Sequence, residues 1–74
     1  MPRRTKLPDG VTREAIFDLR GRILKGDRAA IDEMVSIYVQ VYPRNQHMRD
    51  ELVERRQFTE RNLRMMYLHL EMVR

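Results

Sequence analysis

Apolar residues recur at helical spacing as soon as the chain passes residue 12. Five large ones lie in the next thirteen positions: Ile16, Phe17, Leu19, Ile23 and Leu24. An apolar stripe of this width is typical of an amphipathic helix. Thr12 is placed to cap the helix start, and Gly26 is placed to adopt the left-handed conformation that commonly ends a helix. The pattern predicts a first helix from about Arg13 to Lys25.

A second apolar face begins immediately after that glycine. Its members recur at intervals of three and four residues: Ala30, Ile31, Met34, Tyr38 and Val41. Residues 35–42 also alternate β-branched and other side chains, which is a strand pattern. The helical interpretation is favoured because the face begins at Asp27, a good N-cap, and because a lone strand has no partner elsewhere in the chain. Pro43 disfavours the α conformation at Tyr42, so the second helix should end there.

From Asn45 onward neither Gly nor Pro interrupts the chain. Apart from one gap, apolar residues recur here at intervals of three and four residues: Met48, Leu52, Leu63, Met66, Leu70 and Val73. A polar gap separates the second of these from the third, so residues 46–73 form either one long helix or two. We favour two helices that meet near Phe58, with Thr59 as the N-cap of the last one.

The predicted fold class is therefore all-α, a small bundle of three to four helices in a single domain of residues 12–74. Residues 1–11 are expected to form a flexible basic arm, since Pro2, Pro8 and a turn at Asp9-Gly10 punctuate it. Because the arm has few apolar residues, we expect residues 1–8 to contribute little to the core.

The charge is concentrated in that arm. Of the net charge of +4, Arg3, Arg4 and Lys6 supply three units, and the rest of the chain carries 12 basic and 11 acidic residues. Such an arm is either a solvated tail or a contact for the phosphates of nucleic acid. These three residues are the candidate DNA contacts.

Several classes of function are disfavoured. The chain has no cysteine, which excludes disulfides and thiolate metal sites and favours a cytoplasmic location. No apolar stretch approaches the roughly 18 residues of a membrane span. His47 shares a helix face with Asp50 and Glu51, but no second ligand cluster accompanies them, so a surface pair is the preferred interpretation. We expect no metal, no cofactor and no enzymatic activity in a chain of 74 residues.

Two further features concern the last helix. His69 is expected at the surface or at the edge of the core. The chain holds six methionines, which could fill the core or form an adaptable partner-binding groove, and core filling is favoured.

One segment resembles a known family. The resemblance rests on a helix that ends in Gly-Asp and on an apolar pattern that follows: Gly26, Asp27, Ala30, Ile31, Met34 and Tyr38. These positions look like the start of region 2 of bacterial sigma factors. Downstream, residues 50–54 (Asp-Glu-Leu-Val-Glu) are similar to the opening of the helix with which sigma factors grip RNA polymerase. The resemblance covers about residues 13–56.

The resemblance implies a set of polymerase-facing residues: Asp50, Glu51, Leu52, Glu54, Arg55 and Arg56. The segment after Arg55 departs from the family, because it is not the aromatic-rich helix that recognises the −10 promoter element. No second helix-turn-helix domain follows, and we expect a sigma-like fragment or a small phage-type regulator rather than a complete sigma factor.

Two functional hypotheses follow. The first is a small non-catalytic transcription-associated regulator that binds RNA polymerase, DNA or both. The second is a self-associating helical interaction protein, such as an inhibitor or adaptor, that binds a second copy or another protein through a C-terminal face rich in Met and Leu.

Overall fold

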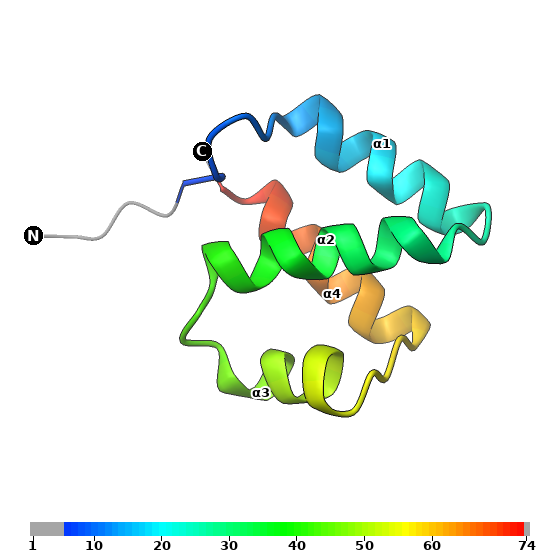
Figure 1. Cartoon of the computed structure of the whole chain (residues 1–74), viewed down its shortest axis with the longest axis vertical. Coiled ribbons are helices and arrows are strands. Elements are labelled where there is room, and N and C mark those ends of the chain that lie inside the picture. The colour runs from blue at the N-terminus through cyan, green and yellow to red at the C-terminus, as the bar shows by residue number, and fades with distance from the viewer. Residues whose placement is uncertain (1–5, 74) are drawn as a thin grey trace, which may run out of the picture.

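The computed structural model describes residues 6–73, which form helices joined by short connections. The elements are α1 (Arg13–Leu24), α2 (Arg28–Val41), α3 (Gln46–Arg49), the π-helical turn η1 (Asp50–Glu54) and α4 (Glu60–Glu71). Figure 1 shows α2 at the centre, with α1 on one side, α3 on the other and α4 crossing behind it. No strand occurs in residues 6–73. The all-α prediction is confirmed.

The connection between α1 and α2 is built as the sequence predicts. Thr12 accepts a hydrogen bond from the backbone N–H of Ala15 at the start of α1. Gly26 has a φ of 90°, and the N–H groups of Gly26 and Asp27 donate to the carbonyl oxygens of Ile23 and Arg22. This pair of bonds is the Schellman motif, in which a left-handed residue satisfies the last carbonyls of a helix.

Asp27 then caps α2 directly. One carboxylate oxygen accepts from the N–H groups of Ala29 and Ala30, and the other accepts from Nε of Arg22 at 2.9 Å. The Arg22 guanidinium, assisted by these backbone donors, lowers the pKa of Asp27. Asp27 therefore binds the end of α1 and caps the start of α2 at the same time.

Residues 35–41, whose alternation allowed a strand, lie wholly within α2. Tyr42 leaves the helical conformation just before Pro43, with a φ of −123° and a ψ of 62°. The predicted end of the second helix is confirmed.

The choice between one and two helices after residue 45 is settled in favour of two. Asn45 caps α3 by accepting from the N–H of Met48, and Thr59 caps α4 by accepting from the N–H of Asn62. Between them η1 loosens into a π-turn, in which the N–H of Arg55 donates to the carbonyl oxygen of Asp50. Arg56 ends this segment with a φ of 49°, a left-handed conformation that is costly for a residue other than glycine.

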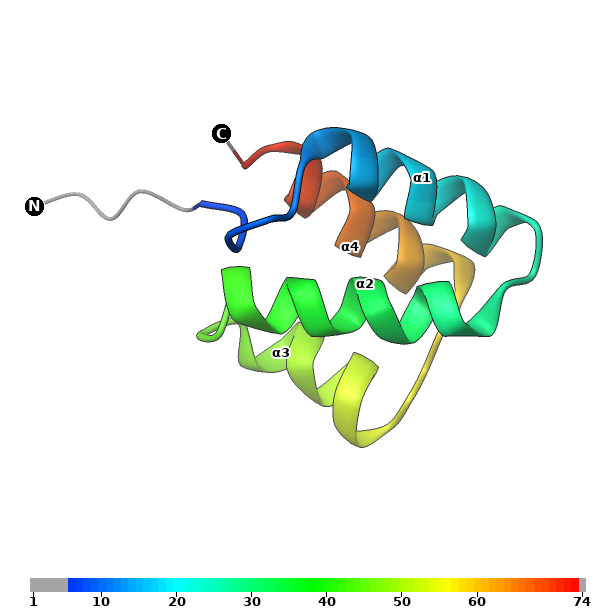
Figure 2. The ribbon, with the colours of Figure 1, turned by 45° about the horizontal axis from the view of Figure 1, so that its top comes forward.

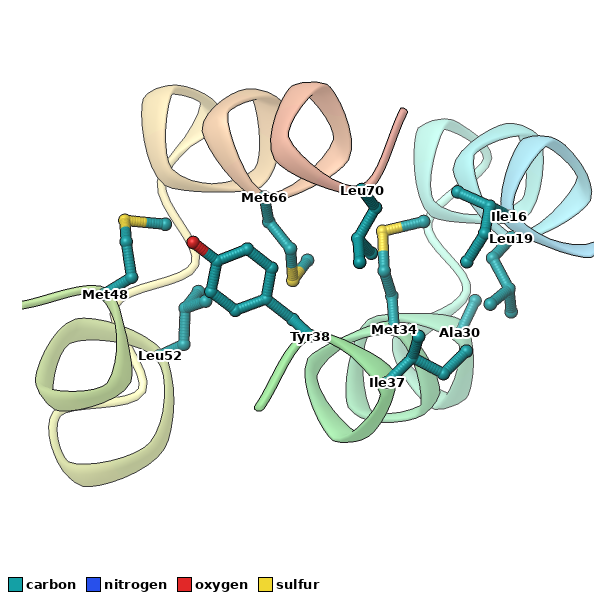
Figure 3. Close-up of a cluster of buried hydrophobic side chains, with 10 residues drawn as sticks. All are labelled: Ile16, Leu19, Ala30, Met34, Ile37, Tyr38, Met48, Leu52, Met66 and Leu70. Carbon is teal, nitrogen blue, oxygen red and sulfur yellow. The ribbon is translucent and has the colours of Figure 1, made fainter. Parts of the chain in front are cut away.

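The core lies between α2 and its neighbours (Figure 3). It comprises Ile16, Leu19, Ala30, Met34, Ile37, Tyr38, Met48, Leu52, Met66 and Leu70. Met34 lies between α1 and α4, and the ring of Tyr38 lies between η1 and α4 (Figure 3). Three of the methionines fill the core, as favoured, while Met65 and Met72 are exposed.

The described part of the predicted arm is not separate from the core. Leu7 and Val11 are partly buried and pack against the core cluster, and the N–H of Val11 donates to the carbonyl oxygen of Pro8. The expectation that residues 1–8 contribute little to the core is therefore wrong for Leu7. Its apolar side chain lowers the free energy of the fold by leaving water and covering part of the core.

Candidate protein-binding surface

Helix α4 carries apolar side chains on two opposite faces. One face enters the core through Leu63, Met66 and Leu70. The other consists of Met65, Leu68 and Met72, whose spacing of three and four residues places them on a single face. All three are exposed, Met72 by 75%. Some of the Met and Leu side chains of α4 therefore lie in the core, and the others are exposed to solvent.

Helix α1 lies beside α4 and runs in the opposite direction (Figure 2). It adds two large exposed side chains at a spacing of seven residues, Phe17 at 65% and Leu24 at 71% exposure. Phe17 borders an open groove of about 330 Å³ between the two helices, whose apolar lining also includes Ile16, Tyr67 and Leu70. We call Phe17, Leu24, Tyr67, Leu68 and Met72 together with this groove the α1/α4 surface.

Two contacts join α1 to α4 on either side of the groove. At one end of the groove Nη2 of Arg13 donates to the carbonyl oxygens of Glu71 and Val73, at 3.3 and 3.0 Å. Further along, the guanidinium of Arg20 lies 4.9 Å from the centre of the Tyr67 ring, a cation–π contact. Because these contacts join α4 to α1 at two separate points, they keep the two walls of the groove in position.

The charges around the groove are separated along its length. Glu14 and Glu71 line the end where Arg13 binds. Arg20 lies about two turns further along α1, and Arg64 lies two turns back along α4, next to Glu60 at 3.7 Å. Two carboxylates therefore lie at the end where Arg13 is bound to backbone carbonyl oxygens, and two arginines lie at the other end, where Glu60 pairs with one of them.

The polymerase-facing residues implied by the sigma resemblance are divided by the structure. Leu52 has no exposed surface, so its expected role as a partner contact is wrong, because a side chain within the core cannot reach a partner. Glu51 is half-buried and pairs with Arg55 at 3.3 Å, and Asp50 accepts from Nε2 of Gln46 at 2.7 Å.

The remaining three residues of that set are accessible. Glu54, Arg55 and Arg56 are exposed at the exit of η1. Arg56 also pairs with Asp32 of α2 at 3.3 Å and lies 5.1 Å from the centre of the Phe58 ring. Residues 50–54 form the end of a helical segment that begins at Gln46.

The candidate DNA contacts lie mostly beyond what the structure describes. Arg3 and Arg4 fall outside residues 6–73, and Lys6 is exposed at the edge of that range. Nothing in the described residues extends these contacts into a basic groove, and their role stays a prediction.

A polar cluster on the other side of α4 was not predicted. Nδ2 of Asn45 donates to the Tyr38 hydroxyl at 3.0 Å, and that hydroxyl lies 2.7 Å from Nδ1 of His69. The Tyr38 hydroxyl and Nδ1 of His69 share a hydrogen bond whose direction is set by the His69 tautomer. Tyr42 donates to the carbonyl oxygen of His69 at 2.6 Å.

This cluster joins three elements through their polar groups. Burial raises the pKa of Tyr38, and the hydrogen bond from Asn45 opposes part of that rise. Burial likewise raises the pKa of Tyr42. In residues 6–73 every buried polar side-chain atom has a hydrogen-bond partner, and the groups of the cluster bond to one another. We assign it to the fold.

The sequence contains a signal for the α1/α4 surface but none for the polar cluster. Phe17 and Leu24 make the apolar stripe of the first helix wider than one neighbour can cover, and Met65, Leu68 and Met72 form a second stripe. No sequence signal brings Tyr38 to His69, because 31 residues separate them.

Other chemistry finds little support in the described residues. No group of three or more His, Cys, Asp or Glu side chains in residues 6–73 is placed to hold a metal ion. Over the same range, no helix has both the length and the apolar character to cross a bilayer. Comparison of the chain with protein-family models, curated proteins and solved structures finds no match.

Proposed function

We propose that this chain is a small non-catalytic interaction protein that binds a protein partner through the α1/α4 surface. The observation that carries the proposal is Phe17, an aromatic side chain that is 65% exposed beside an open apolar groove of about 330 Å³. Single exposed apolar residues are common in monomeric proteins, but an exposed aromatic residue beside an apolar groove that charged residues also line is typical of a binding site.

The size of the chain supports the same conclusion. A domain of about this length buries only about 60% of the surface that its unfolded chain exposes. Small helical domains often gain further burial by association. A groove between two helices also suits an incoming helix, which presents apolar side chains at intervals of three and four residues.

The titratable groups with shifted pKa values support a non-catalytic role. Asp27 and Arg22 serve the α1–α2 junction, and Tyr38 and Tyr42 serve the polar cluster between helices. Each shift has a structural cause in capping or burial.

A photo-crosslinking amino acid at position 17 tests the proposal in the cell that makes the protein. We expect covalent adducts with a protein when the probe replaces Phe17, and none when it replaces Gln40, an exposed residue of α2. The adducts should decrease when Leu68→Asp is added to the probe-bearing chain. Equal adduct formation at positions 17 and 40 would contradict the proposal.

A second candidate is a transcription-associated regulator that binds RNA polymerase. The observation in its favour is that Glu54, Arg55 and Arg56 are exposed together at the exit of η1, where the sigma resemblance expects polymerase contacts. The α1–α2 connection through Gly26-Asp27 also has the form that the resemblance implies.

Charge reversal tests this candidate. Glu51→Arg with Glu54→Arg should abolish retention of bacterial RNA polymerase, whereas Asp9→Arg with Glu33→Arg makes the same change of charge at exposed sites elsewhere and should preserve it. Exposed charge reversals change stability by less than about 1 kcal/mol. Because Glu51 is half-buried and paired with Arg55, circular dichroism and a melting curve must show that the first variant is folded as well as the second. Retention of polymerase by the first variant at wild-type strength would end this candidate.

The DNA contact of the arm is tested by substitution rather than by truncation, because Leu7 packs on the core. Replacing Arg3, Arg4 and Lys6 by Gln should weaken DNA binding about equally on all sequences. The slope of log binding constant against log salt should fall by up to about 3 for three phosphate contacts. An unchanged slope would remove the arm from the interface.

A further inference from the structure

The charges around the α1/α4 surface follow a pattern that is centred on its aromatic residues. On α1, Glu14 and Arg20 each lie three residues from Phe17. On α4, Arg64 lies three residues before Tyr67 and Glu71 four residues after it. Residues at these spacings share a helix face. Since the two helices run in opposite directions (Figure 2), both acidic residues lie at one end and both basic residues at the other.

This charge pattern is complementary to that of a second copy whose α1/α4 surface faces the first in the opposite direction. A two-fold axis can lie in the plane of this surface either along the helices or across them. An axis along the helices would place acidic residues on acidic residues. An axis across the helices, at the level of Phe17 and Tyr67, places Glu14 opposite Arg20 of the other copy and Arg64 opposite Glu71, and it stacks the aromatic residues at the centre.

We infer that the α1/α4 surface binds a second copy of this chain around a two-fold axis that crosses α1 and α4 near Phe17. The inference rests on the proposed function, because it names the partner of the same surface. The contact is isologous, so each complementary charge pair occurs twice. The axis along the helices would bring like charges together and is therefore disfavoured. The charges thus select the orientation of the two copies as well as the partner.

The available charges are free to make these pairs. Glu14 and Glu71 form no ion pair within residues 6–73, and Arg13 beside them is engaged with backbone carbonyl oxygens. Arg64 is held by Glu60 only through an exposed pair at 3.7 Å, which contributes little to stability. Arg20 lies on Tyr67 and can keep this contact while it meets a carboxylate.

The size of the surface sets the strength of the expected contact. Two 12-residue helices side by side present a face roughly 18 Å long and 20 Å wide. This is less than the ~800 Å² per partner of a stable complex. We therefore expect a reversible dimer with a dissociation constant on the order of micromolar or weaker.

Sedimentation equilibrium of the full chain at increasing concentration tests the inference. We expect the wild type to change from monomer to dimer, and Phe17→Asp to stay monomeric over the same range. Val53→Asp is the matched control, since Val53 is also an exposed apolar residue but lies on η1; it should dimerise as the wild type does. A wild type that remains monomeric at millimolar concentration would overturn the inference.

A charge exchange tests the orientation. Glu14→Arg alone places two arginines opposite each other across the axis, and Arg20→Glu alone places two glutamates opposite each other. Each variant should therefore dimerise at least about tenfold more weakly than wild type. In an equimolar mixture both pairs become attractive again, and a heterodimer should form with nearly wild-type affinity. Circular dichroism of each variant checks its fold. A mixture that associates no better than its components would overturn the proposed axis.

The crosslinking experiment separates this inference from the function on which it rests. Adducts at position 17 with twice the mass of the chain support a second copy as the partner. Adducts only with other proteins would overturn the dimer and leave the proposed function standing. Absence of adducts would overturn both.

Discussion

Helix α4 packs against other helices on two sides, and the two contacts are made in different ways. Toward α2 and α3 it is joined by the polar cluster of Tyr38, Tyr42, Asn45 and His69, in which each hydrogen bond is 3.0 Å or shorter. Toward α1 it leaves an open groove beside Phe17. The first contact is complete within the chain, whereas the second leaves apolar surface in water.

The difference indicates that one side of α4 stabilises the fold and that the other side is available for binding. Buried polar groups that are all satisfied specify one arrangement of their helices, because any other arrangement leaves some of them unpaired. An open apolar groove specifies less about the fold but offers free energy to a partner. Variants on the two sides of α4 should therefore differ in their effects.

The largest effect is expected for Tyr38→Phe. The change removes the hydroxyl of the buried Tyr38, which joins Asn45 to His69, and leaves both of these half-buried side chains without that partner. It should cost about 2 kcal/mol of unfolding free energy. Urea denaturation measures the loss. Tyr67→Phe is the matched control on the α1 side, and it should change stability by less than about 0.5 kcal/mol. Equal losses for the two variants would contradict the comparison.

A smaller loss is expected for Tyr42→Phe. Its hydroxyl makes one hydrogen bond, to the carbonyl oxygen of His69, and the half-buried position allows water to take its place. The unfolding free energy should fall by about 1 kcal/mol. A loss as large as that of Tyr38→Phe would mean that the cluster depends on both tyrosines equally.

Alkaline pH should weaken the same side of α4. Burial raises the pKa of Tyr38 and of Tyr42, so the stability that they contribute is fully present below the ordinary tyrosine pKa near 10 and is lost as pH rises through it. At pH 10 the loss is at most about 0.4 kcal/mol for each tyrosine. Thermal melting of the wild type and of the double Phe variant between pH 8 and 10.5 measures it, and the variant should lack this part of the decline.

The smallest effects are expected on the α1/α4 surface. Leu24→Gln and Met72→Gln replace side chains that are mostly in water, so at low protein concentration each should change stability by less than about 0.5 kcal/mol. Their effect should appear instead as weaker association at high concentration. A large loss of monomer stability would show that this surface belongs to the core.

The sequence alone determined the elements whose causes are local. Thr12, Gly26, Asp27 and Thr59 cap or end helices through backbone groups that lie close to each of them along the chain, and Pro43 restricts only the residue before it. Capping and helical periodicity depend on neighbours along the chain, so they can be predicted from it.

The tertiary structure decided what depends on distant residues. Arg56 takes a left-handed conformation where a glycine would be expected, held by Asp32 and Phe58. Leu52 belongs to the core and not to a partner, His69 hydrogen-bonds a tyrosine 31 positions away, and Phe17 stays exposed beside the groove between α1 and α4. The reason is common to all of them: an amphipathic pattern states that a face is apolar, but only the packing of the helices decides which apolar residues are covered.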